Sequence, residues 1–177
     1  MISDEELMRR TANGDLAAFN KIVLRYQHSA WRLASRFLDD PSEVEDVAQE
    51  AFIRIFETAP RYRMSASFKT YFYRILVHLC IDANRKKREL PADNIDDYTS
   101  ADLDPAQRMY DRDREKKVQD AIRKLPSRQR TAIILKEFIE LTYNDIADIM
   151  HTSTKSVERL LARARDALYH ELKKMKK

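Results

Sequence analysis

Hydrophobic residues recur every three or four positions through most of the chain, which is the period of an amphipathic helix. The first such pattern starts after Ser3 and stops near Asn13 and Gly14, and the second starts after Asp15 and runs to about Phe37. Ser3 and Asp15 have side chains that accept a hydrogen bond from an amide of the first helical turn. Because the chain has one glycine and 44% apolar residues, we expect an all-helical protein with few tight turns.

A third helix is predicted to begin at Asp40, because Asp is a favoured cap and Pro41 fits the first turn. Its apolar positions face inward, and three polar residues share the other side at i, i+3 and i+4: Asp46, Gln49 and Glu50. A fourth helix follows Pro60 and ends in the basic run of residues 85–88. An acidic helix surface is usually only solvated, so any role of these three residues depends on their context.

Residues 91–105 contain five acids, no bases and little apolar content, which predicts a flexible linker. The linker would divide the chain into two small helical domains, residues 1–90 and residues 106–177. A helix is predicted to restart at Asp104 and Pro105, and another to begin at Ser127.

The stretch from residue 142 to residue 165 predicts two helices joined by a tight turn. Thr142 and Asp145 have the spacing of a capping box, and Ser153 can cap the second helix. His151 lies at the turn, where the backbone must be left-handed and glycine is the usual residue. This pattern is typical of a helix-turn-helix.

Charge is unevenly spread along the chain, although the net charge is only +4. Residues 61–90 carry eight Lys and Arg against two Asp and Glu, and residues 151–177 carry eight against three. Acidic or neutral segments separate these two basic ones. The pattern predicts two nucleic-acid contacts on one chain.

In the second basic segment, Lys155, Arg159 and Arg163 lie four residues apart on one helical stripe, roughly opposite the apolar positions. Alone, such a stripe is more often a solvated surface. On the second helix of a predicted helix-turn-helix, however, the stripe favours a face that contacts phosphates and base edges.

In the first basic segment, cations alternate with aromatic rings between Arg61 and Arg74. Cations bind a phosphate backbone and aromatic faces stack on unpaired bases, so the segment is suited to single-stranded nucleic acid. Helical spacing assigns Phe68, Tyr71, Phe72, Ile75 and Leu79 to the core, which leaves Tyr62 and Tyr73 as the candidate stacking residues.

Other classes of protein fit the sequence poorly. The four histidines are scattered and no glycine-rich phosphate loop is present, so we expect neither an enzyme nor a bound cofactor or metal. Cys80 is the only cysteine, which excludes an internal disulfide and favours a reducing compartment. No apolar run approaches a membrane span or signal peptide, so we expect a cytoplasmic protein without membrane insertion.

Taken together, these motifs resemble the sigma factors of bacterial RNA polymerase, and among them the small extracytoplasmic-function (ECF) group that keeps only the second and fourth conserved regions. The resemblance covers about residues 4–88 and 110–172. Three stretches carry it by their order and spacing: residues 46–56, residues 67–88, and residues 125–147 running into residues 156–165.

The resemblance implies a fold of two helical domains, with core RNA polymerase and promoter DNA as partners and an anti-sigma factor as a further one. It implies that the polymerase clamp binds Asp46, Gln49 and Glu50. Contacts to the melted minus-ten element are implied for Arg61, Tyr62, Arg63, Lys69, Tyr73, Arg74, His78 and Arg85. Contacts to the duplex minus-thirty-five element are implied for Ser153, Lys155, Ser156, Arg159 and Arg163.

The chain departs from the usual family pattern at several positions. Tyr71 stands where the family usually has Trp, His78 where it usually has Asn, and His151 where it usually has Gly. Glu158 would repel phosphate, so we expect the reading face to tilt toward Arg159 and its stripe.

Two alternatives remain on the residues alone. A stand-alone helix-turn-helix regulator would bind duplex DNA, usually as a symmetric dimer, and would need a ligand pocket or dimer interface in its amino-terminal half. A helical adaptor would bind only protein, and the two basic segments argue against it.

The linker leads to a first prediction. Because residues 91–104 have too little apolar content to form a core, limited proteolysis of the free protein should cut there first and release two stable helical fragments. Mass spectrometry of the early fragments checks the position of the cut. Protection of the whole linker would mean that it is packed against a domain.

Overall fold

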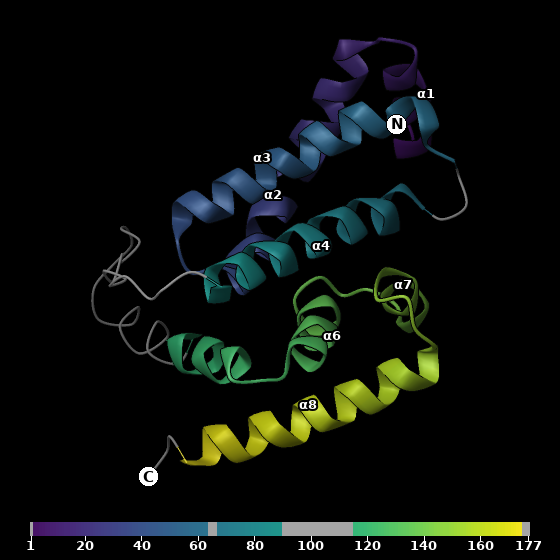
Figure 1. Cartoon of the computed structure of the whole chain (residues 1–177). Coiled ribbons are helices and arrows are strands. Elements are labelled where there is room, and N and C mark those ends of the chain that lie inside the picture. Colours follow the sequence, from purple (N-terminus) through teal and green to yellow (C-terminus); the bar gives the residue numbers. More distant parts are fainter. Residues whose placement is uncertain (1, 64–66, 90–114, 175–177) are drawn as a thin grey trace. The chain divides into compact units, whose positions relative to one another are not determined.

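A computed structural model describes residues 2–63, 67–89 and 115–174 (Figure 1). All regular structure in these residues is helical, which confirms the predicted all-α class. The chain divides into two compact units, one made mainly of residues up to 91 and the other mainly of the residues that follow. The predicted linker and the helix start at Asp104 lie outside the described residues.

The first unit is built from five elements, whose bounds are α1 Asp4–Ala12, α2 Leu16–Phe37, α3 Pro41–Thr58, the short 3₁₀ helix η1 Ala59–Arg61, and α4 Phe68–Glu89. The helices α2, α3 and α4 pack against one another in pairs, and α1 packs on α2 and η1. Figure 1 shows the three long helices running beside each other. The predicted bounds of the first two helices, the predicted start of the third and the predicted end of the fourth at its basic run are confirmed, whereas α4 begins at Phe68 and not directly after Pro60.

Local hydrogen bonds explain where these helices begin. The side chains of Ser3, Asp15 and Asp40 accept from amides two or three residues ahead, at 3.2, 3.0 and 2.9 Å. The Ala18 amide and then Arg10 hold the pKa of the Asp15 carboxyl below its ordinary value. These three caps are the ones that the sequence predicts.

Aromatic packing fills the interior of the first unit. The ring of Tyr26 lies 5.2 Å from that of Phe68 and 4.7 Å from that of Phe72, and Phe52 lies 5.8 Å from Phe72. The hydroxyl of Tyr26 donates a 2.6 Å hydrogen bond to Asp4. Burial, followed by this bond, raises the pKa of Tyr26 well above its usual value. Contacts of these rings therefore join all four α-helices of the unit.

Cys80 on α4 is fully buried in the same unit. Burial raises the pKa of its thiol.

The second unit contains a helical stretch at residues 115–123, followed by α6 Ser127–Glu137, α7 Tyr143–Ile149 and α8 Thr154–Lys174. α6 packs against α8, and an ion pair of 2.8 Å between Glu137 and Arg165 joins the two helices at the surface. Beneath it lie Ile134, Leu161 and Ala164, all fully buried. The apolar faces of these helices form the core of this unit.

The turn between α7 and α8 has the predicted helix-turn-helix features. Thr142 and Asp145 form a reciprocal capping box, in which each side chain accepts from the other residue's amide at 3.3 and 3.2 Å. His151 has a φ of 48°, and the amide of Thr152 donates to the Ala147 carbonyl at 2.9 Å. This bond closes a Schellman-type end to α7. Ser153 then caps α8.

The left-handed backbone at His151 leads to a stability prediction. A residue with a side chain is strained in this conformation by about 1–2 kcal/mol, and glycine would remove that strain. Glycine also loses more conformational entropy on folding, so only part of the strain energy would appear as a gain in stability. His151→Gly should therefore raise the free energy of unfolding by about 0.5–1 kcal/mol in urea titrations followed by circular dichroism. Thr152→Gly is the matched control, because Thr152 has no positive φ and should lose stability. Equal effects of the two substitutions would contradict the prediction.

Candidate nucleic-acid and protein interfaces

The basic stripe on α8 is on the surface. Lys155, Arg159 and Arg163 are all exposed, whereas Val157 and Leu161 on the other side of the helix are fully buried. The burial of one side fixes the rotation of α8 about its axis. Three cations are thereby presented along one exposed face, as the helical period predicts.

The residues beside this stripe limit the width of the positive face on α8. Ser153 accepts the Ser156 amide at 3.2 Å, so the two serines lie together in the first turn of α8. Arg165 is turned toward α6 and pairs with Glu137. Glu158 is exposed, one residue before Arg159, and helical spacing places it nearer the Arg165 side than the stripe. The positive face of α8 is therefore narrow and lies along residues 155–163.

A second candidate surface lies where η1 ends and α4 begins. The ring of Tyr62 lies 5.0 Å from that of Tyr71 and 6.3 Å from that of Phe68. The hydroxyls of Tyr71 and Thr58 share a 2.5 Å hydrogen bond, and the Arg74 guanidinium lies over the Tyr71 ring at 5.7 Å. Tyr62 and Tyr71 are both partly exposed. They form a paired aromatic surface with a cation at one edge.

Tyr73 does not belong to this surface, and the prediction that it stacks on a base is wrong for this arrangement. Only 4% of Tyr73 is exposed, and its ring lies 5.1 Å from that of Phe72. Burial raises the pKa of its hydroxyl, which is hydrogen-bonded to Ser29. Tyr71, which the sequence assigned to the core, is the residue that pairs with Tyr62.

The cations of the first basic segment surround these rings unevenly. Arg61, Arg63 and Lys69 are exposed near the start of α4. Arg74, His78 and Arg85 follow along one side of α4, at spacings of four and seven residues. Arg85 makes an ion pair of 3.9 Å with Asp82. The structure thus brings Tyr62 and Arg74 together at Tyr71, and it extends the positive surface along α4.

The third surface lies on α3. Asp46 and Gln49 are exposed and Glu50 is half-buried, while the neighbouring Val47 and Ala51 are buried in the core. The Gln49 amide donates to Glu45 at 3.3 Å, and Glu50 accepts from Arg54 at 2.8 Å. The predicted polar trio therefore shares one exposed face of α3.

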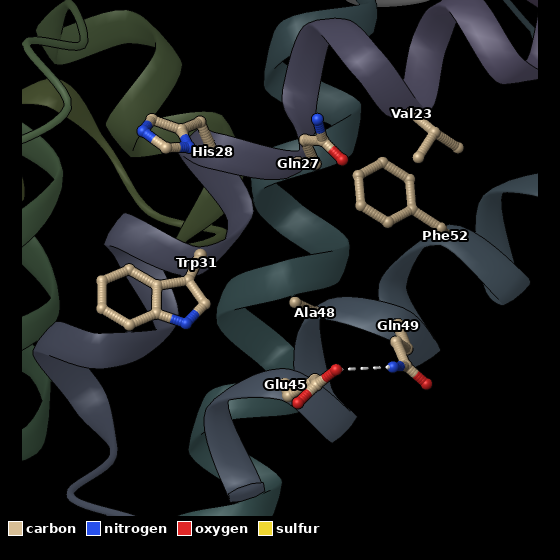
Figure 2. A pocket seen from close by; sticks show the side chains of 8 residues that line it. All are labelled: Val23, Gln27, His28, Trp31, Glu45, Ala48, Gln49 and Phe52. Atoms are coloured by element: carbon tan, nitrogen blue, oxygen red, sulfur yellow. Dashed lines mark hydrogen bonds between the residues drawn. The ribbon is translucent and has the colours of Figure 1, made fainter. Parts of the chain in front are cut away.

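An apolar groove of ≈ 680 Å³ runs beside this face, between α2 and α3 (Figure 2). Figure 2 shows Trp31 and Val23 of α2 along one side, Phe52 and Ala48 of α3 along the other, and Gln49 at the rim next to Glu45. Trp31 is 51% exposed, which is unusual for so large a ring. Sequence analysis missed this residue, although a lone tryptophan on the polar side of an amphipathic helix was the available signal.

Two further observations concern the described residues. No group of three or more His, Cys, Asp or Glu side chains among them is arranged to hold a metal ion. No helix in that part of the chain is long and apolar enough to cross a membrane.

Comparison with known proteins gives the class of this protein. Residues 22–89 match the family model of Sigma-70 region 2, and residues 115–168 match that of Sigma-70, region 4. These stretches contain the two candidate nucleic-acid surfaces and the acidic face of α3. The order of the two matches is the one that the sequence predicts.

Individual relatives narrow the class. The chain is 35% identical to the RNA polymerase sigma-H factor of Pseudomonas aeruginosa, over 93% of this chain and 91% of that protein. It is 32% identical to the ECF RNA polymerase sigma-E factor of Escherichia coli K12, over 94% and 93% of the two chains. It is also 30% identical to the ECF RNA polymerase sigma factor SigW of Bacillus subtilis, over 94% and 95%. The chain therefore belongs to the ECF sigma factors of bacterial RNA polymerase.

Solved structures confirm the fold. CnrH, in complex with the cytosolic domain of CnrY, superimposes with a TM-score of 0.76 at 22% identity, covering 96% of this chain and 97% of that one. The sigma factor RpoE of Bartonella quintana, in complex with the anti-sigma factor NepR, gives 0.67 at 21% identity, covering 88% and 96%.

Proposed function

We propose that this chain binds core RNA polymerase through α3, recognises the duplex minus-thirty-five element through α8, and captures the melted minus-ten element at the start of α4. One observation supports this division most. The exposed stripe of an intact helix-turn-helix and the aromatic–cationic surface of Tyr62 and Tyr71 lie in separate units. A helix face reads base edges in an intact major groove, whereas stacking rings bind bases that have left the duplex.

The proposal assigns residues to three roles. The clamp contact consists of Asp46, Gln49 and Glu50, and the minus-thirty-five contact consists of Ser153, Lys155, Ser156, Arg159 and Arg163. The minus-ten contact consists of Tyr62, Tyr71, Arg61, Arg63, Lys69, Arg74, His78 and Arg85. Residues 91–105 would connect the two domains. Nucleotide addition belongs to the core polymerase, so the chain itself would carry out no catalytic step.

Two further properties follow from membership of the family. We expect the protein to act in the cytoplasm, where polymerase and DNA are found. We also expect an anti-sigma factor to bind it, since related folds occur in complex with the cytosolic domain of CnrY and with NepR. Co-purification of the tagged chain from its own cells would test this partner.

The direct test of the proposed function is reconstitution. The purified chain is mixed with core RNA polymerase and a library of duplexes with randomised promoter elements, and transcripts are sequenced. We expect initiation downstream of a two-part motif. Tight binding of the chain alone to duplex DNA, with no initiation, would instead support the stand-alone regulator.

The clamp contact gives a sharp charge-reversal test. Glu50→Lys should abolish binding to core polymerase, because it places a cation in an acidic docking face. Helix content and melting temperature should hardly change, since a charge swap at a half-exposed helix position and one lost surface pair cost under about 1 kcal/mol together.

Glu6→Lys is the matched control for Glu50→Lys. Glu6 is also a helix-surface carboxylate paired with an arginine, Arg9 at 2.7 Å. The Glu6→Lys variant should bind polymerase like the wild type. Unchanged transcription with Glu50→Lys would contradict the clamp assignment.

The two DNA contacts should separate in kinetics. Arg159→Ala should weaken binding to the upstream element by roughly 1–3 kcal/mol and alter preference at one base pair. Tyr62→Ala should spare the closed complex and slow promoter opening. A template already melted across the minus-ten element should restore part of the lost activity, because the unstacking cost has been met.

Arg165→Ala is the control for Arg159→Ala, because it removes the same charge from the same helix but from a side chain that pairs with Glu137. It should leave base preference unchanged. Equal loss of duplex affinity in Tyr62→Ala and Arg159→Ala, with no rescue by pre-melting, would contradict the division of labour.

A further inference from the structure

The amino-terminal helix α1 precedes the stretch that matches Sigma-70 region 2, which begins at residue 22. It nevertheless packs against η1, and therefore against the segment that leads into Tyr62. None of the roles assigned above includes a residue of α1. Its contacts with the candidate minus-ten surface therefore need an explanation.

Two fully buried side chains, Leu7 and Met8, attach α1 to the first unit. Asp4 adds an ion pair with Arg25 and accepts the 2.6 Å hydrogen bond from Tyr26. None of these contacts involves Glu5. The position of α1 is therefore secured without the Glu5 carboxylate, which leaves that group for another interaction.

Glu5 makes its contact across a sequence separation of 63 residues. Its Oε1 accepts a hydrogen bond of 3.2 Å from the amide of Phe68, the first residue of α4. The Thr70 amide is bound by the Ser67 hydroxyl at 3.1 Å. Free amides at a helix start are costly when buried, and a carboxylate there is favoured by the helix dipole. Glu5 and Ser67 thus share the capping of α4.

The capped turn carries the aromatic surface. The ring of Phe68 contacts those of Tyr62 and Tyr71. The Tyr71 hydroxyl is hydrogen-bonded to that of Thr58, the residue before η1. Burial first, and the charge of Glu5 second, raise the pKa of Tyr62, in agreement with a carboxylate close to that ring. A shift of the α4 start would move both tyrosines relative to each other.

We propose that Glu5 is a positioning residue for promoter opening: by holding the first amide of α4, it fixes the paired rings of Tyr62 and Tyr71 in the geometry that receives an unstacked base. The inference rests on the proposed minus-ten role of this surface. Glu5 itself touches no DNA. Its effect appears only in the step in which a base leaves the duplex.

The structural half of the proposal is tested on the free protein. In amide hydrogen exchange followed by NMR, Glu5→Ala should speed exchange of the Phe68 amide at least about threefold, because its acceptor is removed. Glu6→Ala is the matched control, since the Glu6 carboxylate pairs with Arg9 on the outer surface. Equal protection of Phe68 in both variants would overturn the proposal, whatever the function of the protein.

The functional half is tested with the reconstituted holoenzyme, on a promoter carrying 2-aminopurine in the minus-ten non-template strand. Glu5→Ala should slow the fluorescence rise on opening by about three- to tenfold while polymerase binding and closed-complex affinity stay unchanged. Glu5→Gln keeps an acceptor oxygen and should recover most of the rate, and a pre-melted promoter should reduce the defect of Glu5→Ala.

The outcomes separate the possible failures. Opening by Glu5→Ala as fast as by Glu6→Ala, or a parallel loss of polymerase affinity and melting temperature, would reduce Glu5 to a structural residue and overturn the inference. A wild-type holoenzyme that opens no promoter would instead refute the proposed function.

Discussion

The packing of Tyr26 is the constraint on which the first unit depends. Its ring contacts Phe68 and Phe72 of α4, and its hydroxyl reaches Asp4 of α1. A buried hydroxyl without a partner would be costly, so the position of α1 and the position of Tyr26 determine each other. Because the Tyr26 ring contacts Phe68, the position of Tyr26 also fixes the position of the first residue of α4. The surface proposed to receive an unpaired base is thus built directly on the aromatic core.

In the second unit, α8 is proposed to read an intact duplex, which requires a rigid helix with one side left exposed. α8 achieves both through burial of one stripe against α6 and a short turn after α7. The left-handed residue in that turn, His151, sets the direction in which α8 leaves. The rigid helix of the second unit and the proposed base capture by the first would suit two DNA states that occur in succession.

Much of this organisation could be predicted from the sequence, because helical periodicity and capping are local. Ser3, Asp15 and Thr142 marked helix starts correctly, and the spacing of Lys155, Arg159 and Arg163 placed them on one exposed face. The comparisons confirm the family that the three motifs suggested.

The failures occurred where the decisive contacts are not local. Between residues 68 and 73 aromatic rings are so dense that periodicity could not decide which of them face inward, and Tyr73 was assigned to the surface although it is buried. The hydrogen bond from the Phe68 amide to the Glu5 carboxylate joins residues that no sequence pattern connects. The groove at Trp31 likewise depends on how two helices pack, not on either helix alone.

The burial of Cys80 has a practical consequence. Alkylating reagents and oxidants react with the thiolate, and a fully buried thiol with a raised pKa supplies very little of it near neutral pH. Since Cys80 is the only cysteine, the native chain should react very little with maleimides. A single cysteine introduced on α8 or beside η1 would then accept one fluorophore at one known place, without any prior substitution of the core.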